Sequence, residues 1–281
     1  MSESRRSRGP SRQVRRRRAV VAAGAVVALV VVGVVLAGIL SVGDRSQEAT
    51  STPIPSISPA AAAPRPTPSQ SPDPSIVPTF DKNAHSIDDP ASIWVVVNKL
   101  RPLNPVDYAP DDLVEVPVPY VWQPQLRQEA SAAVVTMFDT FTQETGLELQ
   151  SQSAYRSYST QVEVYDQDVA TNGQEFADTS TARPGSSEHQ TGLVIDISAK
   201  PSSCSLAACF GETPHGQWLA ANAWRFGFIL RYPADKTEIT GFAYEPWHFR
   251  YIGVDLSTEM HETGVATLEE FFGLPAAPNY G

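Results

Sequence analysis

Cysteine and lysine are scarce in this sequence. Its 281 residues include two cysteines, Cys204 and Cys209, and four lysines. None of the lysines stands three positions after a serine, so the S-x-x-K motif of one class of serine hydrolases is absent. The chain has no internal repeats, and its apparent strands and helices do not alternate in the βαβ rhythm of a parallel α/β fold. These absences exclude an S-x-x-K serine enzyme and disfavour a doubly wound sheet.

Only one stretch is long and apolar enough to cross a membrane. Residues 5 to 18 contain eight arginines, and residues 19 to 40 then carry no charge. Crossing a bilayer takes about 20 such residues in a helix, whereas the apolar part of a signal peptide is about 7–15 residues long. We therefore expect a basic cytoplasmic segment at 1–18 and a transmembrane helix at 19–40, with a cleaved signal peptide as the alternative.

The remainder is acidic and begins with a proline-rich stretch. The whole chain carries a net charge of −10 although its N-terminus is basic, which argues against nucleic acid as a partner. Nine prolines lie between Pro53 and Pro78, a composition typical of an extended, disordered spacer. We expect an extracellular linker at 41–92 and one folded domain at 93–281.

In an oxidising compartment the C-x4-C pair of Cys204 and Cys209 is expected to form a disulfide rather than to bind a metal, because two thiols supply only two ligands.

Within the domain, hydrophobic spacing and capping residues indicate mixed elements. Helices are expected at 126–146, from the Thr160-x-x-Glu163 capping box to Gly173, at 213–227 and from Thr267 onward. Strands are expected at 147–154, 193–197, 228–231 and 244–251. This mixture predicts an α+β fold.

Two short segments carry residues suited to metal chemistry. His189 precedes Asp196, which lies inside an otherwise apolar strand, and Glu245 stands three residues before His248 among large aromatics. Taken singly, these are consistent with a hydrogen-bonded structural aspartate, a loop histidine and a polar pair in a core strand. Taken together, they offer three nitrogen or oxygen ligands and a spare carboxylate, the pattern of a catalytic zinc site; manganese and iron stay open.

A shared metal site requires a particular backbone geometry between Glu245 and His248. In a regular strand, the side chains of positions 245 and 248 point to opposite faces. Both reach one metal only if the backbone bends between them, and Pro246 provides a reason for such a bend.

A third segment contains Arg156, whose planar guanidinium suits a substrate carboxylate or a developing oxyanion, although a surface arginine is an equal alternative.

Four blocks in this order resemble the VanY-type zinc D,D-carboxypeptidases. They are S-A-Y-R-S-Y-S-T-Q, S-S-E-H-Q-T-G-L-V-I-D-I, F-G-F-I-L-R-Y-P and E-P-W-H-F-R-Y-I-G, and V-V-N-K-L-R-P-L at 96–103 is similar to the family's entry segment. The resemblance covers about residue 96 to the C-terminus. It implies a compact single catalytic domain with a central antiparallel sheet flanked by helices, shared with hedgehog signalling domains. It also implies removal of the terminal D-Ala from D-Ala-D-Ala-ending peptidoglycan stem peptides.

The same resemblance implies specific roles. One zinc ion per chain would bind to His189, Asp196 and His248, with Glu245 as the catalytic base. Arg156 would stabilise the transition state and bind substrate, together with Ser187 and Gln161. Arg183 departs from the small residue expected at its position and could line the cleft mouth.

The expected protein is a monomer, anchored by a single span with its catalytic domain outside the cell. A D,D-dipeptidase, a peptidoglycan endopeptidase and, less favoured, a non-catalytic wall-binding module on the same fold are the alternatives.

Overall fold

The computed structural model describes residues 80–281, which form an α+β domain. The basic segment, the span at 19–40 and the linker as far as residue 79 lie outside the described residues. Within 80–281, none of the helices combines the length and the apolar character needed to cross a membrane.

The central sheet has four strands in the order β3-β4-β6-β5, and all neighbours are antiparallel. The strands are β3 (Glu148–Ser153), β4 (Val194–Lys200), β6 (His248–Tyr251) and β5 (Phe228–Leu230). A second, two-stranded sheet pairs β1 (Leu113–Glu115) with β2 (Gln125–Arg127). The expected antiparallel sheet is thus present.

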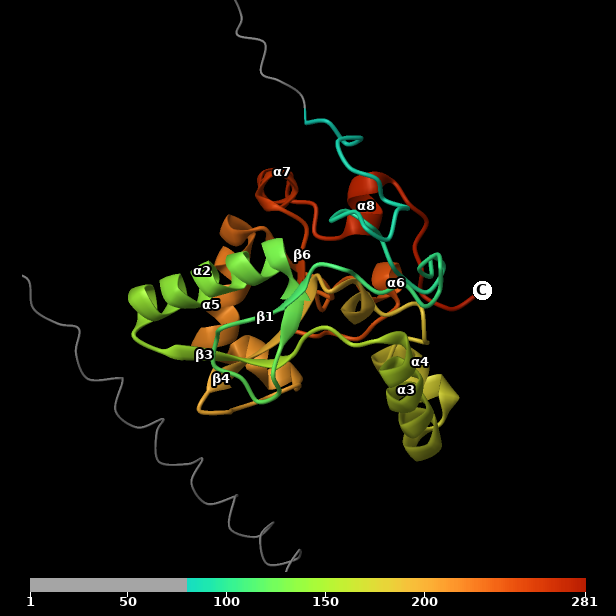
Figure 1. Cartoon of the computed structure of the whole chain (residues 1–281), viewed down its shortest axis with the longest axis horizontal. Helices are drawn as coiled ribbons and strands as arrows, with labels where there is room; N and C mark the ends of the chain where they lie inside the picture. The colour runs from blue at the N-terminus through green and yellow to red at the C-terminus, as the bar shows by residue number, and fades with distance from the viewer. Residues whose placement is uncertain (1–79) are drawn as a thin grey trace, which may run out of the picture. The chain divides into compact units, whose positions relative to one another are not determined.

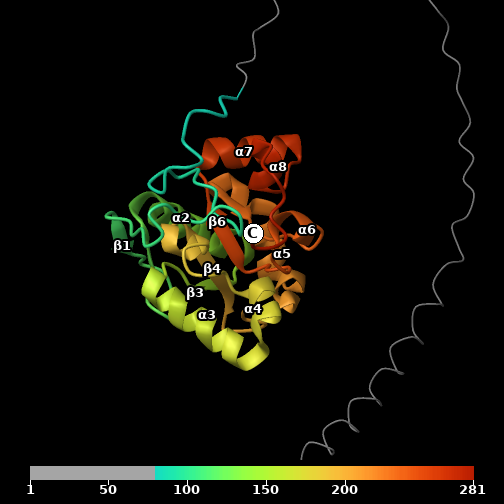
Figure 2. The same ribbon diagram turned by 90° about the vertical axis from the view of Figure 1, so that its right-hand side faces the viewer.

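Helices surround this sheet. They are α2 (Gln128–Thr145), α3 (Tyr158–Asn172), α4 (Gln174–Ser180), α5 (Pro214–Asn222), α6 (Thr237–Thr240), α7 (Val254–Thr263) and α8 (Leu268–Phe272). Short 3-10 helices are η2 (Glu188–Thr191), η3 (Ala208–Glu212) and η4 (Ala223–Phe226). Helices α3 and α4 lie side by side at one end of the domain, and α7 and α8 lie at the other end, in both views (Figures 1 and 2).

Strand alternation gives the sheet one apolar and one polar face. Ile195 and Ile197 of β4 and Phe249 and Tyr251 of β6 lie in the main hydrophobic core, together with residues of α2 and α5 such as Phe141. Because successive side chains of a strand point to opposite faces, Asp196 and His248 must lie on the other face. The core on one face therefore fixes which residues face the cleft described below.

The folded part begins before residue 93, where the sequence placed the end of the linker. Phe80 stacks on Trp94 with 5.6 Å between ring centroids, and Lys82 Nζ donates a hydrogen bond to the carbonyl of Phe271. Ile87 packs against the same cluster, which includes residues of α7 and α8. The segment that starts at Phe80 is thus part of the domain.

Most element ends agree with the sequence, and one cap does not. Gly146 and Gly173 follow α2 and α3 as expected, and Thr267 caps α8 by accepting from Glu270 N. The helix expected to open at Thr160 opens three residues earlier, because Ser157 Oγ accepts from Thr160 N. Ser157 and Thr160 are both favourable N-cap residues, and the capping-box pattern Thr160-x-x-Glu163 favours the later start in the sequence.

Candidate metal centre

Asp196 and His248 are brought together by strand pairing. They are directly opposed partners in the β4–β6 ladder, and both point to the polar face of the sheet. Opposed residues on one face of an antiparallel pair have neighbouring Cβ atoms. Asp196 Oδ1 accordingly lies 3.2 Å from His248 Nδ1.

His189 comes from η2, in the loop that leads into β4. Gly192 ends this short helix with φ +67°, and a Cβ atom there would meet Leu113 at 2.8 Å, so the tight entry to β4 requires glycine. His189 Nδ1 lies 2.6 Å from the carbonyl oxygen of Ala154, which can only accept, so Nδ1 carries the proton. His189 Nε2 is thereby directed at Asp196 Oδ2, 3.4 Å away.

These three side chains have the geometry of a metal site. Their candidate ligand atoms all lie within 4.8 Å of one another, and all three residues are buried. Ligands bound tetrahedrally to zinc at about 2.0–2.2 Å lie roughly 3.3–3.6 Å apart, close to the 3.2 Å between Asp196 and His248 and the 3.4 Å between Asp196 and His189. Asp196 Oδ1 is buried without a hydrogen-bond partner among the described residues, as expected of a ligand atom. The donor set therefore fits zinc.

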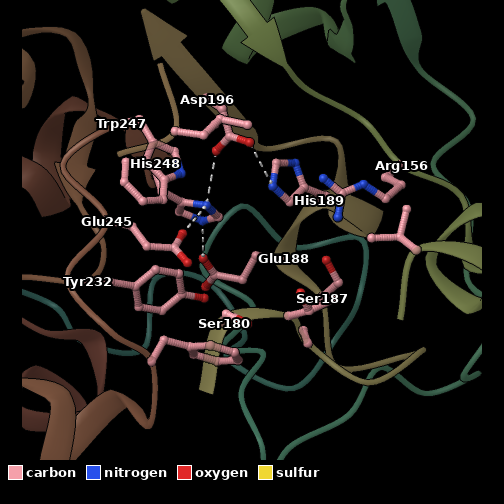
Figure 3. Close-up of a pocket in the computed structure, with 15 residues that line it drawn as sticks. Arg156, Ser180, Ser187, Glu188, His189, Asp196, Tyr232, Glu245, Trp247 and His248 are labelled. Carbon is pink, nitrogen blue, oxygen red and sulfur yellow. Dashed lines mark ion pairs between the residues drawn. The ribbon is translucent and has the colours of Figure 1, made fainter. Parts of the chain in front are cut away.

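Glu245 joins this group through a turn rather than a strand. The strand expected at 244–251 begins only at His248, and Pro246 and Trp247 form a turn closed by a hydrogen bond from His248 N to Glu245 O. The required bend is present, and Glu245 Oε2 lies 3.5 Å from His248 Nδ1. Figure 3 shows the Glu245 carboxylate pointing toward His248.

Electrostatics separate the roles of these groups. Burial raises the pKa of Glu245 to about 7, and the Asp196 charge adds to this effect while His248 and Arg156 oppose it. A carboxylate with a pKa near 7 suits a general base at neutral pH. Burial disfavours the charged form of Asp196, but His189, His248 and Arg156 outweigh it and lower its pKa.

The pKa values of the two histidines are shifted in opposite directions. Burial lowers the pKa of His189 to about 3, so its Nε2 lone pair is free for a metal. Burial acts the same way on His248, but the carboxylates of Asp196, Glu188 and Glu245 outweigh it and raise its pKa to about 9. A metal therefore displaces a proton from His248 when it binds at neutral pH.

Arg156 lies beside His189, at the edge of the same cleft (Figure 3). Its Nη1 donates to Gln161 Oε1 at 3.0 Å, and its backbone N donates to His189 O. Burial lowers the pKa of Arg156, and the charges of Asp196 and Glu245 oppose that shift. A mostly buried guanidinium facing the metal group is placed to bind developing negative charge.

Gln161 does not line the cleft, contrary to the expectation that it contacts substrate. It is fully buried, and its side chain is engaged by Arg156 on one side and by the Ala182 carbonyl, at 2.7 Å, on the other. Gln161 therefore orients Arg156. The sequence could not distinguish the two roles, because a glutamine five residues after the arginine is compatible with either.

The walls of the cleft come from elements distant in sequence. Ser187 lines it, as expected. Cys204 and Cys209 form a disulfide, and within this small loop Leu206 adopts φ +50° and reaches the cleft. Besides Arg156 and the metal group with Glu245, the other lining residues are Val164, Ser180, Thr181, Ala182, Glu188, Tyr232, Phe242 and Trp247.

Arg183 lies away from the cleft. Its guanidinium forms two hydrogen bonds with Asp178, at 2.8 and 3.0 Å, and stacks over the ring of Tyr280. It fastens α4 to the C-terminus, so the idea that it lines the cleft mouth is wrong.

A buried ion network next to the metal group was missed by the sequence analysis. Glu188, Arg231, Arg250 and Glu269 have side chains with no exposed surface and are joined by ion pairs. The sequence did indicate this network, because the arginines within F-I-L-R-Y and W-H-F-R-Y are as unusual in apolar segments as Asp196 is.

A buried His/Asp/His donor set with an adjacent carboxylate and an arginine defines a mononuclear metallopeptidase type of site. Comparison with known proteins identifies the family of peptidases to which the chain belongs. The model of the family described as VanY, D-alanyl-D-alanine carboxypeptidase, matches residues 123–254. The protein YodJ of Bacillus subtilis (strain 168), a carboxypeptidase by name, is 41% identical over 192 residues, covering 66% of this chain and 69% of YodJ.

Solved structures of carboxypeptidases also match this chain. The LdcB LD-carboxypeptidase matches with a TM-score of 0.61 at 41% identity, covering 66% of this chain and 87% of LdcB. A VanY D,D-pentapeptidase variant in complex with Zn(II) gives 0.54 at 33% identity, covering 63% of this chain and 97% of the other. VanYB in complex with D-alanine-D-alanine gives 0.54 at 34%, covering 64% and 96%. The chain belongs to the VanY family of D-alanyl-D-alanine carboxypeptidases.

Proposed function

We propose that this protein is a zinc carboxypeptidase that removes the terminal D-Ala from D-Ala-D-Ala-ending peptidoglycan stem peptides. The observation that carries the proposal is the convergence of His189, Asp196 and His248 on one point, with the Glu245 carboxylate 3.5 Å from His248. Family membership supports the reaction class. The similarity to a VanY protein in complex with Zn(II) supports zinc as the metal.

In this proposal His189 binds the metal through Nε2, His248 through Nδ1 and Asp196 through its carboxylate. Zinc, when bound, supplies Lewis acidity that polarises the scissile carbonyl and acidifies the attacking water. Glu245 takes the proton of that water and passes it to the departing D-Ala amine. Its raised pKa makes both transfers feasible near pH 7.

Arg156 binds the negative charge that develops on the substrate. Its guanidinium faces the metal group, and Gln161 and the backbone of His189 hold it in place. Ser187, at the cleft surface, helps to hold the peptide. Preorganised donors of this kind contribute mainly in the transition state.

The location of the enzyme is a proposal from the sequence. The uncharged run at 19–40, after an arginine-rich segment, supports a single-pass anchor with the domain outside the cell. The proline-rich stretch after it supports a tether that lets the domain reach the wall. We propose a monomer, with stem peptides as its partner and no role for nucleic acid.

One alternative has an observation in its favour. LdcB, an LD-carboxypeptidase, resembles this chain more strongly than the VanY structures do, in both identity and TM-score. An L,D-carboxypeptidase removes D-Ala from a tetrapeptide, where the preceding residue has the L configuration. The two activities differ in the residue next to the scissile bond, which the cleft walls contact.

A substrate panel decides between these activities. The full-length chain with zinc should release one D-Ala from a pentapeptide stem much faster than from a tetrapeptide stem, and should not cleave free D-Ala-D-Ala. Preference for the tetrapeptide would replace the D,D-assignment with L,D-carboxypeptidase activity. Cleavage of the free dipeptide alone would indicate a dipeptidase. No release from any substrate by the zinc-loaded chain would favour a wall-binding module.

A further inference from the structure

Glu188 is a fully buried carboxylate that stands directly before His189 but points toward the other histidine. It opens η2, and Figure 3 shows its side chain below His248 on the side away from Asp196. Its side chain has no exposed surface. A charge so placed is costly unless it is paired, so its contacts indicate what it does.

The two carboxylate oxygens have different partners. Glu188 Oε1 accepts from Arg231 Nε at 2.9 Å and from Arg250 Nη1 at 3.1 Å. Glu188 Oε2 lies 3.5 Å from His248 Nε2. Both of these atoms are buried, and neither has a hydrogen-bond partner elsewhere in residues 80–281. The free oxygen of Glu188 and the outer nitrogen of His248 therefore face each other.

This arrangement determines which nitrogen His248 presents to the cleft. A carboxylate accepts hydrogen bonds and does not donate them, so it favours a proton on His248 Nε2. Nδ1, which lies 3.2 Å from Asp196 Oδ1, is then the nitrogen that gives up its proton when a metal binds. His189 has the opposite arrangement, with Nδ1 against the Ala154 carbonyl and Nε2 toward Asp196. Metal-binding histidines commonly have their second nitrogen held by such an acceptor.

The carboxylate is itself held in place by charge. Arg231, which directly follows β5, and Arg250 of β6 both donate to Glu188, and Arg231 also makes a bidentate ion pair with Glu269 of α8, at 2.8 and 3.0 Å. Asn98 Nδ2 donates to Glu269 at 2.9 Å. Two guanidinium groups balance two carboxylates, so Glu188 is not free to turn away from His248. Asn98 and Glu269 lie outside the segment that the family model matches.

We propose that Glu188 is a positioning residue that fixes the orientation and tautomer of His248, so that His248 binds the metal through Nδ1. Arg231 and Arg250 hold the Glu188 carboxylate in the position required. This inference rests on the proposed function, because it requires that His248 binds zinc.

Substitution of Glu188 by glutamine tests the proposal with little change in shape. The amide oxygen should stay with the two arginines, which only donate, and the amide NH₂ then faces His248 Nε2. That NH₂ donates a hydrogen bond and so shifts the imidazole proton to Nδ1, the metal-binding atom. Glu269→Gln is the matched control, because it removes a charge from the same Arg231 without facing His248.

Zinc affinity is measured by chelator competition on the full-length chain without substrate, and thermal unfolding of the metal-free proteins is recorded in parallel. Glu188→Gln should bind zinc about 10–100-fold more weakly than the natural protein, whereas Glu269→Gln should differ by less than about threefold. Equal zinc affinity in a folded Glu188→Gln variant, or an equal loss in both variants, overturns the proposal.

A second measurement needs no variant. Long-range ¹H–¹⁵N spectra of the zinc-loaded natural chain with labelled histidine should show His248 protonated on Nε2 and His189 protonated on Nδ1. Metal bound through His248 Nε2 overturns the proposal even if Glu188→Gln fails to fold. A natural chain that binds no zinc at all refutes the proposed function, which is a different result from either of these.

Discussion

Replacing Arg231 with methionine should destabilise the domain more than any exposed arginine could. The Arg231 side chain has no exposed surface and donates three charge-assisted hydrogen bonds, one to Glu188 and two to Glu269, at 2.8–3.0 Å. Without it, Glu188 keeps Arg250 as a partner, but Glu269 keeps only the amide of Asn98. A buried carboxylate is then left without a compensating charge.

The expected loss of unfolding free energy follows from this unpaired buried charge. Removing one partner of a buried ion pair costs about 3–5 kcal/mol, and methionine keeps most of the buried volume, so we expect a loss of about 4 kcal/mol. In a domain of about 200 residues, each kcal/mol shifts Tm by about 2–4 °C, which predicts a decrease of about 8–16 °C. Arg231→Met combined with Glu269→Gln should recover part of this loss, because no charge is then left unpaired at Glu269.

Thermal and urea unfolding of the metal-free proteins measures the effect, and Arg225→Met is the matched control. Arg225 also makes a two-fold pair, with Glu144, but both side chains are more than one third exposed. Its loss should cost less than about 1 kcal/mol. If the Arg231 and Arg225 variants lose similar stability, or if the double variant is less stable than Arg231→Met alone, an unpaired buried charge at Glu269 is not the cause of the loss.

Three further predictions concern the cleft. Glu245→Gln should lower kcat by about 10²–10⁴-fold while zinc content stays unchanged; retained activity would exclude Glu245 as the base. Because the pKa of His248 is raised to about 9 without metal, zinc must displace its proton at lower pH. The apparent zinc affinity should therefore rise about tenfold per pH unit from about pH 6 to 8 and level off near 9, and a flat profile would contradict this. Leu206→Ala should raise KM for stem peptides about fivefold with little change in kcat, as expected for about 1 kcal/mol of apolar contact. Leu100→Ala, equally exposed but outside the cleft, should leave KM unchanged, and an identical response of both variants would remove Leu206 from the substrate site.

The metal group could be foreseen because a charged residue in an apolar strand is anomalous. Asp196 stood out for this reason, and the spacing of Glu245 and His248 required a bend that the structure places at Pro246 and Trp247. The pairing of Asp196 with His248 could not be read from the sequence, because strand register depends on packing between distant segments. The residues converge because Phe249 and Ile195 are buried on the opposite face.

The supporting residues were harder to foresee. Gln161 was expected to bind substrate and Arg183 was considered for the cleft mouth, yet both hold other groups, Arg156 in one case and the C-terminal Tyr280 in the other. A polar residue in the right segment can point inward or outward, and local pattern does not determine which. Helix α7 was missed because its N-cap residue is Gly253, which has no side chain that could mark the start of a helix.

In the proposed function, one zinc ion bound by His189, Asp196 and His248 is required for the hydrolysis. The most direct measurement is the rate of D-Ala release by the metal-free, full-length chain as zinc is added stepwise. Activity should rise linearly and stop rising at one zinc per chain, and Asp196→Asn should abolish this tight phase while remaining folded. Full activity without zinc, or an unchanged titration of Asp196→Asn, would contradict it.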